Sequence, residues 1–439
     1  MKVLMMTHDV GLVGGIERSL LLAAGALVDQ GHTVYLAHGE GTVGPDAPFA
    51  ESLFLPAFFD RGPKWESRQV RREVRRLRDF VRDNGVELLH VHGIPRNAVQ
   101  FRLPRIAPTV TTYHNLSCPN TARYQWGPRQ PCSRTIGVSC VTTGYRRLGC
   151  GRVGDGSPLG LLQFLRGMQQ DRRMRAAVRR SDRIVAPSAW TRDLLVSEGA
   201  DPARVDVVAP PITTFARRTP PDAQRVPLVS YVGRLVDFKG VDVVLRASQA
   251  IDVPHRVVIA GDGPVRGELE ALAAELGIAE RVEFVGSVSP EAAQELREAS
   301  AVVAVPSLVP ETFCMAGPEA LAVGTPVVAH AVGGMGAWIS QGGPLVSVAG
   351  LSEVGDWTAL LRERLLAAPD GGDRRRVESR IRAGLSVQAH TAALLEVYAA
   401  ALGAAPHRPE AATRVPVGAM AALLPLLALV ALLGGLVLA

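Results

Sequence analysis

Two glutamates, Glu311 and Glu319, have the spacing and surroundings best suited to chemistry in this sequence. Glu311 lies in a proline-broken loop after an apolar run, and Glu319 lies at the start of a short helical pattern. Pro318 is tolerated only in the first turn of a helix, which fixes where this helix begins. Its first residues are then Met315, Ala316 and Gly317. Their free backbone N–H groups, beside two carboxylates, suit a ligand with both anionic and hydroxyl-rich parts.

Two cations, Arg234 and Lys239, flank another turn, at the end of an expected strand at 228–232. The protein uses arginine almost everywhere, and its only other lysines are Lys2 and Lys64. A lysine at 239 therefore suggests that this position needs the compact charge of an ammonium group instead of the planar guanidinium of arginine. Two cations on one such turn can stabilise a diphosphate leaving group, whose negative charge grows as its bond breaks. Taken singly, each is equally well explained as a solvated surface charge.

The elements that would position these side chains alternate between strands and helices. This alternation predicts an α/β protein with parallel sheets covered on both faces, and such sheets bind ligands at their carboxyl edges. The best linker is the polar, proline-containing stretch 213–227, and 439 residues are enough for two domains with extra segments. The expected strands are 2–6, 33–37, 88–91, 109–112, 183–186, 205–209, 228–232, 256–260, 282–285, 301–305 and 325–329.

Two weaker features lie in the first half. Gly14 and Gly15 lie in a glycine-rich turn after the first expected strand, where backbone N–H groups can approach an anion. The spacing is not that of a dinucleotide fingerprint, and a tight structural turn explains it equally well. His114 directly follows the strand 109–112, at an edge where α/β proteins place ligands, although a lone histidine is more often structural.

The segment 116–165 lacks periodicity and holds four cysteines, so we expect something to hold it in place. One possibility is a zinc site, but the spacing contains no C-x-x-C pair, and reduced cysteines without a metal are the default expectation. A cytoplasmic location argues against disulfides. The four cysteines are Cys118, Cys132, Cys140 and Cys150.

Two segments point towards a membrane. Residues 415–439 carry no charge and are long enough to cross a bilayer as a helix, and Arg408 and Arg414 precede them. We therefore expect a tail anchor that keeps the main body cytoplasmic, with a buried terminal helix as the alternative. The basic helix expected at 61–82 has an apolar stripe, which would lie either on an anionic membrane or against the sheet. Few aromatics and no basic stretch interleaved with them make nucleic acid an unsuitable partner.

The motifs together resemble the retaining glycosyltransferases of family 4, which have the GT-B fold. The resemblance rests on the Gly14-Gly15 turn, His114, and the stretches 233–240, 261–264 and 311–328, in this order over residues 1–400. The most specific part is the pair of glutamates followed by Gly324-Thr325-Pro326. One departure is Cys314, at a position that is often glycine in the family and that bears on backbone approach.

The resemblance implies two Rossmann-like domains facing each other across a cleft, with a nucleotide-sugar donor, such as a UDP- or GDP-sugar, and no required cofactor or metal. The implied domains are 1–212 for the acceptor and 228–402 for the donor, with a linker at 403–414 before the anchor. Arg234 and Lys239 would hold the diphosphate, Glu311 the sugar hydroxyls and Glu319 the ribose. The remaining implied donor contacts are Gly14, Gly15, His114, Met315, Ala316, Gly317, Gly286 and Ser287.

The resemblance leaves the acceptor open, and we expect a lipid-linked or polysaccharide glycan. A sugar-nucleotide epimerase of the same architecture would need further acid and base groups in the cleft and no acceptor. A membrane-bound protein that binds sugar nucleotides without catalysis is the alternative outside enzymes, and the intact Glu311, Glu319, Arg234 and Lys239 argue against it.

Overall fold

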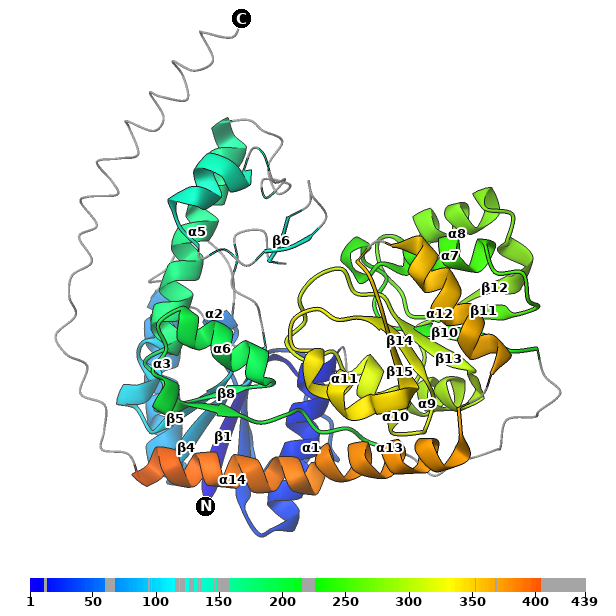
Figure 1. Cartoon of the computed structure of the whole chain (residues 1–439). Coiled ribbons are helices and arrows are strands. Elements are labelled where there is room, and N and C mark those ends of the chain that lie inside the picture. Colours follow the sequence, from blue (N-terminus) through cyan, green and yellow to red (C-terminus); the bar gives the residue numbers. More distant parts are fainter. Residues whose placement is uncertain are drawn as a thin grey trace, which may run out of the picture. The chain divides into compact units, whose positions relative to one another are not determined.

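The structure is a computed structural model of the whole chain, and Figure 1 shows its course. It describes most of residues 1–403. The positions left out are 12–13, 60–67, 94, 96, 115–117, 119–122, 126–129, 133, 135, 146, 148–149, 151–157, 215–225, 352, 368 and 404–439. The expected tail anchor at 415–439 and its linker at 403–414 therefore lie outside the described residues, apart from Gly403.

The first half of the chain forms a seven-stranded sheet in the order β3-β2-β1-β4-β5-β8-β9. All its neighbouring strands pair in parallel, as the alternation of strands and helices predicted. Its central strands are almost completely buried because helices cover them. The strands are β1 (Lys2–Asp9), β2 (Thr33–Glu40), β3 (Ser52–Phe54), β4 (Leu88–Val91), β5 (Thr109–Thr112), β8 (Arg183–Ala186) and β9 (Val205–Val207).

The helices of this half are amphipathic and turn their apolar faces to the sheet. In the basic helix α3 (Arg68–Asn84), the apolar stripe is buried in the core with β1, β2 and β4, so the stripe is not available to enter a membrane. Ser188 caps α6 by accepting a hydrogen bond from the Thr191 backbone N–H, as expected for a serine before a helix. The other helices are α1 (Gly15–Asp29), α2 (Pro56–Phe59), α4 (Asn97–Gln100) and α6 (Ala189–Ser197), with 3-10 turns η1 (Leu103–Arg105) and η4 (Pro202–Arg204).

The cysteine-containing segment has more regular structure than its sequence indicated. It includes a short antiparallel hairpin of β6 (Tyr124–Gln125) and β7 (Gln130–Pro131), and a π-helical turn η2 (Cys140–Tyr145). Helix α5 (Pro158–Val178) begins inside the segment that the sequence indicated to be aperiodic. The aperiodic stretch is therefore shorter than residues 116–165, because α5 takes its last eight residues.

The second half forms a six-stranded parallel sheet in the order β12-β11-β10-β13-β14-β15. Its strands are β10 (Leu228–Val232), β11 (Arg256–Ala260), β12 (Val282–Gly286), β13 (Val302–Val305), β14 (Val327–His330) and β15 (Val346–Ala349). Its helices are α7 (Val241–Gln249), α8 (Arg266–Glu275), α9 (Pro290–Ala299), α10 (Ala316–Leu321), α11 (Gly336–Gly342), α12 (Val354–Leu366) and α13 (Gly371–Gly384), with η5 (Asp237–Lys239), η6 (Ala279–Arg281) and η7 (Gly343–Leu345).

The last described helix, α14 (Val387–Gly403), packs on the first half of the chain. Its apolar side chains Leu394, Val397 and Tyr398 are buried against α1 and the first sheet (Figure 1). The apolar face of α14 is buried against the first sheet although the helix follows the second sheet in sequence. Local sequence does not reveal which of the two sheets this face will contact. Within the part of the chain that the structure describes, no helix is long and apolar enough to cross a membrane.

Candidate active site

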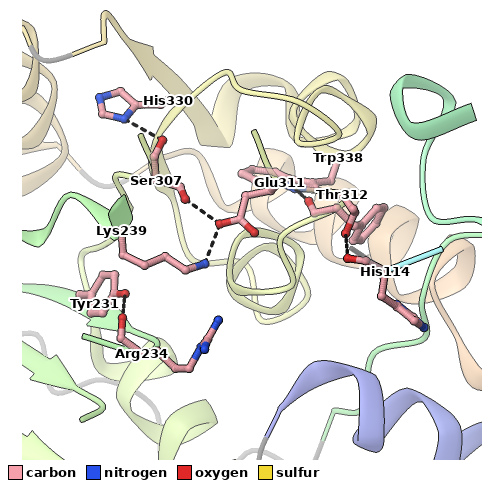
Figure 2. Close-up of polar contacts among 10 residues, drawn as sticks. His114, Tyr231, Arg234, Lys239, Ser307, Glu311, Thr312, His330 and Trp338 are labelled. Carbon is pink, nitrogen blue, oxygen red and sulfur yellow. Dashed lines mark hydrogen bonds and ion pairs between the residues drawn. The ribbon is translucent and has the colours of Figure 1, made fainter. Parts of the chain in front are cut away.

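Lys239 and Glu311 meet at the carboxyl edge of the second sheet, where the neighbouring strands β10 and β13 end (Figure 2). Lys239 Nζ lies 2.6 Å from Glu311 Oε1, and the Ser307 hydroxyl donates to the same oxygen over 2.6 Å. Burial has the largest single effect and lowers the pKa of Lys239. The charge and hydrogen bond of Glu311, with Cys314 and Tyr231, together raise it by more, so that the pKa lies above its usual range. The ammonium group therefore remains charged at neutral pH. The sequence pointed to both charged residues but gave Ser307 no role.

The two loops that carry this pair are joined through their backbones. The Leu308 N–H donates to the Phe238 carbonyl over 2.9 Å. Gly240 has φ +68, and a Cβ atom there would lie 2.2 Å from the Pro306 carbonyl oxygen. Only glycine allows this approach without strain. The Gly240 position therefore sets how closely the Lys239 loop packs on the Glu311 loop.

Glu319 lies in the first turn of α10 and contacts two arginines. Arg297 of α9 forms a hydrogen-bonded ion pair with Glu319 Oε2, with only 7% of its side chain exposed. Arg18 of α1 lies 3.5 Å from Glu319 Oε1. Both contacts keep the carboxylate oriented at the start of the helix, where the backbone dipole also favours an anion. Neither arginine was predicted: Arg18 directly follows the glycine-rich turn, and Arg297 carries no signal in the sequence.

Helix α10 begins where Pro318 predicted, with Met315 as its capping residue and Ala316 and Gly317 as its first two residues. Cys314 has φ +66, a conformation that glycine adopts without cost. Burial, and then the nearby Glu311, raise the pKa of the Cys314 thiol to about 12. The thiol is therefore protonated and unreactive at neutral pH.

Gly15 of the first sheet domain lies beside this helix start. A Cβ atom on Gly15 would lie 3.6 Å from the Met315 side chain. Gly14 is the residue before α1, and both glycines are exposed. The structure thus brings the predicted glycine turn to the amino end of α10, next to Arg18 and Glu319.

His114 is half-buried and lies beside the buried His90 and His92 at the carboxyl edge of the first sheet. Its carbonyl oxygen accepts a hydrogen bond of 3.5 Å from the Thr312 hydroxyl, one residue after Glu311 (Figure 2). Its ring stacks on that of His92 with 5.9 Å between centroids, and His92 lies 3.2 Å from His90. Burial, and then the nearby His390, lower the pKa of His114 to about 4. His114 is therefore a neutral imidazole, which can donate a hydrogen bond to a ligand or accept one from it.

The remaining predicted residues lie at or just after the carboxyl ends of β10 and β12. Arg234 is exposed on the same turn as Lys239, and its carbonyl accepts a hydrogen bond of 2.9 Å from Tyr231 (Figure 2). Gly286 and Ser287 lie at the end of β12, the edge strand of the sheet. A ligand contacting all of these groups would extend along the sheet edge from β13 to β12.

The four cysteines of the segment 116–165 are thiols, not disulfides. Among the residues that the structure describes, no group of three or more histidine, cysteine or acidic side chains is placed to hold a metal ion. Burial, and then Cys132 and Cys140, raise the pKa of Cys150 to about 11. A zinc site formed by these cysteines stays a prediction.

Two family models match successive parts of the chain and meet at residues 213–214. The model described as "Glycosyltransferase Family 4" matches residues 13–214, and the model described as "Glycosyl transferases group 1" matches residues 213–377. The chain belongs to glycosyltransferase family 4. The family resemblance inferred from the motifs is thereby confirmed, and with it the GT-B type of fold.

Curated relatives include the D-inositol 3-phosphate glycosyltransferases of Mycobacterium tuberculosis and Mycobacterium bovis, each 38% identical over 240 residues. The match covers 50% of this family 4 chain and 48% of each relative. The chain therefore spans about half the length of the curated relatives it matches.

Solved structures of glycosyltransferases share the fold over most of this chain. A glycosyltransferase from Rickettsia africae has a TM-score of 0.68 at 15% identity, covering 92% of this chain and 99% of its own. The Anabaena protein Alr3699/HepE, in complex with UDP and glucose, has a TM-score of 0.64 at 16% identity, covering 91% and 99%. At these identities the likeness supports the fold alone.

Proposed function

We propose that this protein is a retaining glycosyltransferase that moves a sugar from a nucleotide-diphosphate donor to a hydroxyl group of an acceptor. The observation that carries the proposal is the Lys239–Glu311 pair, with Nζ and Oε1 2.6 Å apart at a sheet edge. It combines a cation for a departing diphosphate with a carboxylate for sugar hydroxyls and positive charge at the sugar. Membership of family 4 and the UDP complexes of proteins that share the fold support a nucleotide-sugar donor.

The donor would bind along the edge of the second sheet. Lys239 and Arg234 hold the diphosphate, and the backbone N–H groups at the start of α10 and at Gly15 add donors that favour an anion. Glu319, oriented by Arg297, accepts hydrogen bonds from the ribose hydroxyls. The backbone around Gly286 and Ser287 contacts the base of a UDP- or GDP-sugar, and His114 contacts the sugar.

In the transfer step, the bond between the sugar anomeric carbon and the diphosphate oxygen breaks. Lys239 and Arg234 stabilise the charge that develops on the leaving diphosphate, while Glu311 stabilises the positive charge at the sugar. The acceptor oxygen forms the new bond on the face that the diphosphate leaves, and its proton passes to a diphosphate oxygen. The products are the glycosylated acceptor, with the anomeric configuration kept, and a nucleoside diphosphate.

We propose a lipid-linked or polysaccharide glycan as the acceptor, bound by the first sheet domain. The uncharged residues 415–439, preceded by Arg408 and Arg414, support a membrane anchor with the sheet domains in the cytoplasm. The anchor is tested by deleting residues 415–439 and separating membranes from soluble protein. Release of the truncated protein is the expected result, and continued membrane binding would contradict the anchor.

The donor is tested by incubating the purified full-length protein with a panel of UDP- and GDP-sugars and measuring nucleoside diphosphate release. Release that depends on an added acceptor is the expected result. D-inositol 3-phosphate belongs in the acceptor panel because the curated relatives are named for it. Conversion of a donor into another sugar nucleotide, without acceptor, would instead support an epimerase. Nucleotide binding with no turnover of any donor would support a non-catalytic protein.

A further inference from the structure

The hairpin of β6 and β7, in the cysteine-containing segment, contacts both sheet domains, and Figure 1 labels its strand β6. Its strands pair Tyr124 with Pro131 and Gln125 with Gln130, and the Cys132 N–H donates to the Arg123 carbonyl over 2.7 Å. Arg123 and Tyr124 are adjacent in sequence, and each is buried against a different domain. We call these two residues the hairpin anchor.

Arg123 attaches the hairpin to the first sheet domain through buried charges. Its guanidinium pairs with Glu198 at the end of α6, and Arg175 of α5 lies 3.2 Å from the same carboxylate. The side chains of Arg123 and Glu198 are only 5% and 3% exposed. Arg123 also has φ +48, which is unusual for a residue with a side chain. Its position is therefore fixed by a specific buried contact, not by the hairpin alone.

Tyr124 attaches the hairpin to the second sheet domain through apolar contact. It is fully buried in a small cluster with Leu308 and Val309, and Phe238 packs against the cluster. Leu308 and Val309 lie between Ser307 and Glu311, and Phe238 directly precedes Lys239. The ring of Tyr124 thus packs on both loops that carry the proposed catalytic pair.

These loops have little regular structure of their own to fix them. The Lys239 loop is a single 3-10 turn, and residues 306–311 form no helix or strand. Besides Tyr124, the first domain contacts this region at Thr312, whose carbonyl accepts from the Ser188 hydroxyl over 2.8 Å. Contacts within the second domain, such as the Gly334 N–H donating to the Glu311 carbonyl over 2.7 Å, hold these loops from one side, and packing from the first domain adds a second support.

We propose that Tyr124 is a positioning residue for sugar transfer, and that the cysteine-containing segment serves the reaction by supplying it. The inference rests on the proposed function of the Lys239–Glu311 pair. The buried ring keeps the two loops in the arrangement that aims both charged groups at the bond that breaks, and it covers one side of the pair against water. The rate of catalysis depends steeply on the placement of the reacting groups. A small shift of the loops therefore lowers the rate of transfer far more than it lowers the affinity for the donor.

The test compares Tyr124→Ala with Tyr124→Phe, which keeps the ring, and with Val138→Ala. Val138 is the matched control because it lies in the same segment but is 77% exposed. For each variant, kcat, KM for the donor, and the share of donor lost to hydrolysis are measured, with affinity for UDP and GDP by calorimetry. Val309→Ala, which thins the same cluster from the other domain, is the second variant.

We expect Tyr124→Ala to lower kcat about tenfold or more and to raise the hydrolysed share, with nucleotide affinity unchanged. Tyr124→Phe and Val138→Ala should match the natural protein, and Val309→Ala should fall between. A kcat of Tyr124→Ala within twofold of the natural protein would overturn the inference, as would a loss confined to nucleotide affinity. If the natural protein turns over no nucleotide sugar, the proposed function fails and the inference fails with it.

Discussion

Acidification should destabilise this protein through the four histidines buried between the first sheet and α14. Burial, reinforced by neighbouring histidines, lowers the pKa of His90 to about 3, whereas burial alone lowers that of His390 to about 4. His114 also has a pKa of about 4, and that of His92 lies well below its ordinary value of 6.5. In the unfolded chain each of the four would titrate near 6.5. Between these values the unfolded chain binds more protons, so stability falls as the pH falls.

The size of this destabilisation follows from the difference between the pKa of each histidine in the folded chain and its pKa in the unfolded chain. Between pH 7 and pH 5, a histidine that stays neutral when folded lowers the free energy of unfolding by about 2 kcal/mol. The three histidines with a pKa of about 3 or 4 together lower it by about 6 kcal/mol, which is comparable to the whole stability of an ordinary domain. The loss begins near pH 6.5 and continues until the folded-state pKa values are reached.

The assay is urea denaturation at pH 7 and pH 5. His390→Gln should reduce the difference between the two pH values by about 2 kcal/mol, because one titration is removed. His8→Gln is the control, since 45% of its side chain is exposed and it lies outside the cluster. An unchanged pH dependence in His390→Gln, or an equal change in both variants, would refute the reasoning.

Three further predictions concern stability around the site, each measured by urea denaturation. Gly240→Ala, whose Cβ would lie 2.2 Å from the Pro306 carbonyl, should cost more than about 2 kcal/mol, whereas Gly25→Ala, inside α1 with open space around it, should gain about 1 kcal/mol. Cys314→Gly should be stabilising by about 1 kcal/mol, because it relieves the positive φ of 66°, and a clear loss would contradict that account. Ser188→Ala should cost more than Ser289→Ala: both serines cap a helix, worth about 1 kcal/mol, but only Ser188 also donates to Thr312. Equal losses in the two serine variants would show that the Thr312 contact adds nothing.

Much of the fold could be predicted from local patterns. The strands at 88–91, 109–112, 183–186, 228–232 and 256–260 have the bounds that the sequence indicated, because short apolar runs between turn residues specify buried parallel strands. The start of α10 followed from Pro318, and its cap at Met315 agrees. These features depend on residues that are close in sequence.

Features that depend on distant residues could not be predicted. Helix α14 packs on the first sheet, and nothing in residues 387–403 indicates which of the two sheets will cover its apolar face. Arg297 and Ser307 hold Glu319 and Glu311, but a single arginine in a helix or a serine in a loop carries no signal until the fold brings it to its partner. The apolar stripe of α3 was compatible with a membrane or a core, and only the packing decided for the core.

The central claim is that the Lys239–Glu311 pair carries out sugar transfer, and the most direct test is the rate of nucleoside diphosphate release in Lys239→Ala beside Lys2→Ala. The Lys239→Ala variant loses the contact with the leaving diphosphate. The Lys2 ammonium instead donates to the Asn84 carbonyl at the surface, far along the chain from the site. The account predicts a rate about 100- to 1,000-fold lower for Lys239→Ala and an unchanged rate for Lys2→Ala. Near-normal release by a folded Lys239→Ala variant would contradict it.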